Sequence, residues 1–124
     1  MSDEAVADEI FAIGPKIRYA AFGRGQDVVL RERPGLTDAS SRESDRYEEL
    51  LVNPTLLKLA GQRGDIDCGG LRYLVVAYGN FWQLVIPTGP ASHVSVSVEL
   101  DADPIAAASR VVAVVEGHAD HAGT

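Results

Sequence analysis

Three residues near the C-terminus, His118, Asp120 and His121, have side chains that bind metal ions. Imidazole and carboxylate groups are ordinary zinc ligands, but a site needs three or four of them held in a fixed geometry. These three stand within the short segment HADHAGT, and no element around the segment would hold them in place. We therefore interpret residues 118–124 as a flexible tail and expect no metal site.

Two further residues could take part in catalysis, His93 and Cys68, but neither has a partner in the sequence. A nucleophile needs an adjacent base, and a base needs a group from which to take the proton. His93 opens an alternating strand without an identifiable serine or cysteine partner, and no cation near Cys68 would stabilise a thiolate. The sequence therefore predicts no catalytic residue, no cofactor and a protein that is not an enzyme.

The segment GRGQD at residues 23–27 has the glycines of a phosphate-binding loop but not its other features. The Lys-Ser/Thr ending is missing, and the segment leads into a predicted strand rather than a helix. Arg24 stands at the tip of this turn, where it could reach a partner as an arginine finger does, although a solvated turn residue is the simpler interpretation. We keep Arg24 as a candidate partner-facing residue.

The composition limits the architecture and the partners. A chain of 124 residues with 46% apolar content fits a single domain, residues 1–124, with one core. Eleven basic residues are scattered among eighteen acidic ones, and the net charge of −7 disfavours binding to nucleic acids and to anionic membranes. The acidic N-terminus does not resemble a signal peptide, and no run approaches the roughly 18 to 20 apolar residues of a membrane span. With a single cysteine, we expect a soluble, cytoplasmic domain.

The apolar spacing predicts a helix over residues 2–13 that ends at Gly14-Pro15, followed by a hairpin of strands 16–22 and 26–33. Residues 36–67 are ambiguous. One long helix could kink at Pro54, or two helical pieces could meet at Asn53-Pro54, with the second ending at Gly61 and Gly64. We favour the two pieces.

Three strands and a last helix follow. Residues 71–78 are almost continuously apolar, which is typical of a central strand covered on both faces. Gly79-Asn80 predicts a tight turn into strand 81–86. The alternation from residue 93 onward places valines on one face of the strand and His93, Ser95 and Ser97 on the other. We expect this second face to be exposed to solvent or to face a partner. Asp103-Pro104 begins the last helix and Gly117 ends it, so the ordered core covers about residues 2–117.

This order, α-β-β-α-β-β-β-α, predicts an α+β fold in which both terminal helices pack on a five-stranded antiparallel sheet. Tyr78, Phe81 and Trp82 cluster around the Gly79-Asn80 turn and add apolar surface on two sheet faces. Surplus apolar surface needs a partner, so we expect a homodimer and take Trp82 as another candidate partner-facing residue.

The order of elements resembles the roadblock/LC7 domain, a profilin-like fold, over about residues 2–116. The resemblance rests on GRGQDVVLRE, on GLRYLVVAYGNFWQLVIP as paired strands, and on HVSVSVELDADPIAAASRVVAVV as the last strand and helix. It implies a non-enzymatic homodimer that pairs through helices or sheet edges and binds a small Ras-like GTPase or another signalling protein. It implies no catalytic residue.

The same arrangement of two strands, a helical segment and three strands also resembles, more weakly, the PAS sensor domains. That resemblance would imply a small-ligand sensing module with a pocket near the middle helices, and the length of residues 36–67 suits it.

Overall fold

The structure is a computed structural model that describes residues 2–122, with the side chains of residues 2–118. Helices and strands follow one another in the predicted order. The elements are α1 (Asp3–Phe11), β1 (Ile17–Arg24), β2 (Asp27–Glu32), α2 (Arg42–Tyr47), the π-helical turn η1 (Glu48–Val52), α3 (Asn53–Asp67), β3 (Leu74–Ala77), β4 (Trp82–Gly89), β5 (Ser92–Val98) and α4 (Pro104–Ala122).

As the sequence predicts, the five strands form one antiparallel sheet. The structure shows that their order in the sheet is β2-β1-β5-β4-β3. The central strand is β5, in which Val96 pairs with Ala20 on one side and Leu84 on the other. The prediction that residues 71–78 form a central strand is wrong, because β3 has only four residues and lies at the edge. A continuous apolar run is equally compatible with an edge strand whose outer side is left for a partner.

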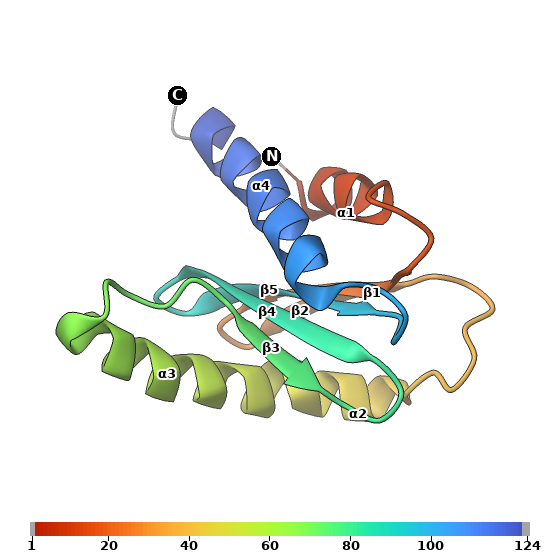
Figure 1. The fold of residues 1–124 in the computed structure, drawn as a ribbon, viewed down its shortest axis with the longest axis horizontal. Coiled ribbons are helices and arrows are strands. Elements are labelled where there is room, and N and C mark those ends of the chain that lie inside the picture. The colour runs from red at the N-terminus through yellow and green to blue at the C-terminus, as the bar shows by residue number, and fades with distance from the viewer. Residues whose placement is uncertain (1, 123–124) are drawn as a thin grey trace.

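Helices cover both faces of the sheet (Figure 1). The terminal helices α1 and α4 lie together on one face, as predicted, and the run α2-η1-α3 covers the other. The valines of β5 alternate toward α1 and α4, where the main hydrophobic core lies. This core contains Val6, Ile10, Ile17, Phe22, Leu84, Ile86, Val94, Val96, Val98, Ala108 and Val111, all at least 95% buried.

The first helix follows from local chemistry. The Ser2 Oγ atom accepts a hydrogen bond from the backbone N–H of Ala5 at 3.1 Å, and Asp3 and Glu4 occupy the positive end of the helix dipole. Val6 and Ile10 then point into the core, four residues apart on one face. The predicted helix is confirmed, although it ends at Phe11 rather than Ile13.

The middle helices are continuous from Arg42 to Asp67, so the two predicted pieces are one helical run. Val52 keeps helical dihedral angles, φ −68° and ψ −57°, directly before α3. Pro54 has no N–H to bond to the carbonyl four residues earlier, and the π turn η1 precedes it, where a wider turn accommodates the proline ring. A proline of this kind can distort a helix without ending it.

The predicted end of this helical run is also wrong, because α3 passes through Gly61 and Gly64. It ends at Asp67, and Gly69 and Gly70 follow with φ values of +80° and +89°. Gly64 allows a close approach, since a Cβ atom there would lie 3.0 Å from the backbone of Gly70. The glycines inside the helix therefore serve packing, and the pair after it supplies the left-handed backbone that reverses the chain.

The last helix begins as predicted, where Asp103 Oδ1 accepts hydrogen bonds from the backbone N–H groups of Ile105 and Ala106 at 3.0 and 3.2 Å. It continues through Gly117 to Ala122, so the predicted end at Gly117 is wrong. One glycine inside a helix costs only about 1 kcal/mol. Among residues 2–122, no helix combines the length and the apolar sequence that a bilayer crossing needs.

Candidate functional site

A row of exposed apolar side chains runs along α2, η1 and α3. Five of the nine large apolar side chains that are exposed among the described residues lie here, with exposed fractions from 36% to 74%. Those on α3 follow a spacing of i, i+3 and i+10, which keeps them on one side of the helix. We call this row the helix surface: Tyr47, Leu51, Leu56, Leu59 and Ile66.

The sheet face behind the helix surface is polar. On β5 the residues that alternate with the core valines are His93, Ser95 and Ser97, and all three are buried. Tyr19 on the neighbouring strand β1 shares this face, because it pairs with Ser97. Buried polar groups need hydrogen-bond partners. A side chain of η1 is the partner of several groups on this face of the sheet.

That partner is the carboxylate of Glu49, which is only 1% exposed. Its Oε1 atom lies 2.7 Å from His93 Nε2 and accepts a hydrogen bond from Asn53 Nδ2 at 3.0 Å. Its Oε2 atom accepts from the Ser95 hydroxyl at 2.6 Å and also from the Tyr19 hydroxyl. We call these five residues the polar layer. It joins η1 to β1 and β5, so the helix surface is held in place by hydrogen bonds rather than by apolar packing alone.

Local geometry explains why these groups meet. The π turn η1 aims Glu49 at the sheet, and Asn53 follows one helical turn later. On β1, Gly23 pairs with His93, and a Cβ atom at Gly23 would lie 2.3 Å from the imidazole Cε1 atom. Only glycine leaves room for the histidine ring in its present position beside Glu49.

The polar layer and its surroundings change the ionisation of two tyrosines. Burial, reinforced by the negative charge of Glu49, raises the pKa of Tyr19 far above its ordinary value. Partial burial, with the Glu48 carboxylate beside it, raises the pKa of Tyr78 to about 12. The Tyr78 hydroxyl lies 3.0 Å from both carboxylate oxygens of Glu48. Both phenols therefore keep their protons in the folded chain at pH values where an exposed tyrosine ionises.

A pH dependence follows from the pKa of Tyr78. Below pH 10 the phenol is protonated in both the folded and the unfolded chain. Between pH 10 and about 12 the unfolded chain releases this proton and the folded chain retains it. The contribution of Tyr78 to the free energy of unfolding is therefore lost as the pH rises. We expect Tyr78→Phe to show a shallower fall in the free energy of unfolding between pH 10 and about pH 12 than the wild type, measured by urea denaturation. An equal slope for both proteins would contradict this assignment.

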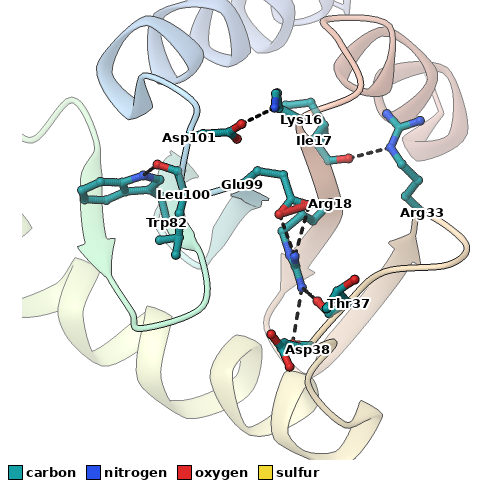
Figure 2. Close-up of polar contacts among 10 residues, drawn as sticks. All are labelled: Lys16, Ile17, Arg18, Arg33, Thr37, Asp38, Trp82, Glu99, Leu100 and Asp101. Carbon is teal, nitrogen blue, oxygen red and sulfur yellow. Dashed lines mark hydrogen bonds and ion pairs between the residues drawn. The ribbon is translucent and has the colours of Figure 1, made fainter.

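A second set of polar contacts ties the loop after β2 to the end of the sheet (Figure 2). Arg18 is 3% exposed, and its Nη1 atom donates to Glu99 Oε1 at 2.9 Å. Its Nη2 atom donates to the carbonyl oxygen of Thr37, also at 2.9 Å. Figure 2 also shows Arg33 Nε donating to the carbonyl oxygen of Ile17 at 2.7 Å. The Arg18 contacts hold Thr37 and Asp38 of the loop against the end of the sheet.

The residues predicted to face a partner lie in different parts of the molecule. His93, Ser95 and Ser97 are all buried, so the expectation that this side of the strand is exposed to solvent is wrong. His93 and Ser95 lie against Glu49 of η1. Arg24 is exposed and forms a bidentate ion pair with Asp3, in which Nη1 and Nη2 donate to the two carboxylate oxygens at 2.7 and 2.5 Å. Trp82 is half-buried at the other end of the sheet, and its indole N–H donates to the carbonyl oxygen of Leu100 (Figure 2). Contact between a partner and any of these residues stays a prediction.

Among the side chains that the structure describes, the residues considered for metal binding or catalysis do not lie together. His118 lies on α4 and contacts the Glu9 carboxylate, while the side chains of Asp120 and His121 lie outside the described residues. Cys68 is exposed at the end of α3. Among the described residues, no group of three histidine, cysteine or acidic side chains could hold a metal ion.

The chain resembles known proteins in its structure but not in its sequence. No protein-family model matches the sequence, and no curated protein matches it. A solved structure of a roadblock/LC7 domain from Streptomyces avermitilis is similar with a TM-score of 0.70 and 17% identity, and the match covers 100% of both chains. The chain has a roadblock/LC7 fold.

Two other roadblock-like structures agree. MglC from Myxococcus xanthus is similar with a TM-score of 0.62 and 12% identity, over 94% of this chain and 96% of that one. The gliding protein MglB from Thermus thermophilus is similar with a TM-score of 0.59 and 13% identity, over 92% of this chain and 90% of that one. The roadblock fold thus spans almost the whole chain, and the resemblance noted in the sequence is confirmed at the level of the fold.

Sequence reasoning missed two features of this fold, the helix surface and the polar layer. The sequence did carry one signal for them. Glu49 stands among the apolar residues of EELLV, where an acidic side chain that points inward must find hydrogen-bond donors.

Proposed function

We propose that this chain is a non-enzymatic, homodimeric interaction protein that regulates a small Ras-like GTPase. The observation that carries the proposal is the helix surface, in which five large apolar side chains lie exposed along one helical run of an acidic protein. Leaving such a row in water is unfavourable, and rows of this kind mark protein interfaces. The roadblock fold supports the same proposal, because the resemblance implies pairing through helices or sheet edges.

A second copy of the chain is the partner that fits the helix surface. In a twofold-symmetric dimer each patch contacts the same patch of the other copy, so an apolar row meets an equally apolar row. Each copy carries a net charge of −7, which opposes association, and burial of the helix surface must offset this repulsion. The outer edge of β3 offers further pairing groups, because its backbone is paired only with β4 among the described residues.

The proposal that the partner is a small Ras-like GTPase rests on two features. One is the roadblock resemblance, and the other is an exposed arginine, Arg24, at the end of the sheet. Arg24 is held by Asp3 in the isolated chain, and a phosphate-bearing partner would compete with this carboxylate for the guanidinium group.

The test uses purified small GTPases from the same organism, each loaded with GDP or with a non-hydrolysable GTP analogue. The immobilised chain is expected to bind at least one of them with a preference for one nucleotide state. Arg24→Ala is expected to weaken that binding, and Arg110→Ala, at an exposed arginine on α4 away from the helix surface, is the matched control. If a chain that dimerises binds none of them at micromolar concentrations, the GTPase part of the proposal fails and the dimer part stands.

A further inference from the structure

A pocket of about 480 Å³ opens between α2, η1, the loop after β2 and the turn between β3 and β4. Its floor is the polar face of the sheet, formed by Tyr19, Gln83 and Ser97. Most of the surface that lines the pocket is apolar. The volume is within the range of small-molecule sites, roughly 300–1,000 Å³. The pocket shares Tyr19 with the polar layer and does not include Glu49.

The charges that line the pocket are predominantly negative. Glu32, Asp45 and Glu48 contribute carboxylates from β2, α2 and η1. Arg18 is the one cationic side chain among the described lining residues, and its charge is matched by the ion pair with Glu99 outside the pocket walls. The balance inside the pocket therefore favours a cation and disfavours an anion.

The negative charges of two of these carboxylates, Asp45 and Glu48, are not fully balanced by positive charges of the chain. Burial raises the pKa of Asp45, and the nearby charge of Glu49 adds to the effect. Burial likewise raises the pKa of Glu48, with further contributions from Glu49 and Asp45. A positive charge placed between Asp45 and Glu48 would relieve this repulsion.

Aromatic rings complete the walls. Tyr78 and Phe81 meet edge to face with their ring centroids 5.6 Å apart, and Tyr47 on α2 also lines the pocket. The Arg18 guanidinium lies 5.4 Å from the centre of the Phe81 ring, so this ring already packs against a cation of the chain, while no Arg or Lys side chain lines the Asp45 and Glu48 side of the pocket among the described residues. Aromatic faces beside carboxylates are the surroundings that organic ammonium ions favour.

The observation that points to a missing ligand is Gln83. Its side chain comes from β4 onto the floor of the pocket and is only 2% exposed. The amide nitrogen Nε2 has no hydrogen-bond partner among the described residues. An orphaned buried amide costs about 1–3 kcal/mol, and a bound water, ion or ligand that accepts its hydrogen bond would remove this cost. A ligand with a hydroxyl or carbonyl oxygen would supply the acceptor.

We propose that this pocket binds a small organic amine, with its ammonium group near Asp45 and Glu48, its flat body against Tyr78 and Phe81, and a hydroxyl or carbonyl oxygen at Gln83. No catalytic step is involved. The pocket lies next to α2 and η1, so a bound ligand adds contacts to the elements that carry Tyr47 and Leu51 of the helix surface.

Three compounds of nearly equal shape test the proposal by isothermal titration calorimetry. Tyramine carries an ammonium group and a phenol, 4-ethylphenol lacks the charge, and 4-hydroxyphenylacetate carries a negative charge instead. We expect tyramine to bind about tenfold more tightly than 4-ethylphenol, and 4-hydroxyphenylacetate to show no binding. Equal affinity for tyramine and 4-ethylphenol, or no saturable binding of tyramine at millimolar concentration, would overturn the proposal.

A pair of variants locates the binding site. Glu48→Gln is expected to weaken tyramine binding by about tenfold and to leave the affinity for 4-ethylphenol unchanged. Glu43→Gln is the matched control, because Glu43 is an exposed carboxylate on α2 outside the pocket lining. Thermal unfolding of both variants verifies that they fold. An equal loss of tyramine binding in both variants would show that the amine responds only to the net charge of the protein, which contradicts the assigned pocket.

Discussion

Glu49→Ala is expected to lower the free energy of unfolding by about 4 kcal/mol. The substitution removes the acceptor shared by Tyr19, Asn53, His93 and Ser95, and it leaves these donors buried without partners. It also opens a cavity under η1, where the Glu49 side chain is fully enclosed. Urea denaturation followed by far-UV circular dichroism measures the change.

Two control variants make the Glu49 result specific. Glu43→Ala on the exposed side of α2 is expected to change the free energy of unfolding by less than about 0.5 kcal/mol. Glu49→Gln keeps the shape and one acceptor oxygen, and the hydroxyls of Tyr19 and Ser95 can rotate to accept from its amide, so we expect about half the loss. A loss below about 1 kcal/mol for Glu49→Ala would show that the polar layer does not hold η1 on the sheet.

Leu59→Asp is expected to convert a dimer into a monomer without unfolding the chain. Leu59 lies in the middle of the α3 part of the helix surface and is 63% exposed, so an aspartate there costs little in the isolated chain. In a twofold dimer the substitution acts twice, and the loss of two buried leucines, at about 1.5–3 kcal/mol each, weakens association by more than about 100-fold. Size-exclusion chromatography with light scattering reports the mass.

The matched control for Leu59→Asp is Ile105→Asp. Ile105 is an aliphatic residue of similar exposure, 54%, but it lies on α4, across the sheet from α3 (Figure 1). It is expected to leave the dimer intact. If Ile105→Asp dissociates the dimer and Leu59→Asp does not, the interface lies on the α4 face instead.

The sequence predicted the elements whose determinants are local. The last helix begins at Asp103-Pro104 as expected, and the alternation from His93 to Val98 gives a strand. Gly79-Asn80 turns the chain between β3 and β4. Each of these features depends on residues within a few positions of one another, so the spacing in the sequence is sufficient evidence.

The features that depend on distant residues could not be predicted. Glu49 and His93 are 44 positions apart, and only the register of β5 and the π turn η1 bring them to 2.7 Å. The alternation at His93 and Ser95 correctly indicated a polar sheet face, but it could not show whether water or a helix covers that face. Pro54 raised the same difficulty, because whether a proline ends or only distorts a helix depends on the packing around it.

The central claim is that the helix surface pairs two copies of the chain. Sedimentation equilibrium of the wild-type protein over a range of micromolar concentrations tests it most directly. We expect a mass of 26.4 kDa, twice the 13.2 kDa of one chain. A mass of 13.2 kDa at every concentration would contradict the account, because five exposed apolar side chains on one helical run would then have no partner of their own kind.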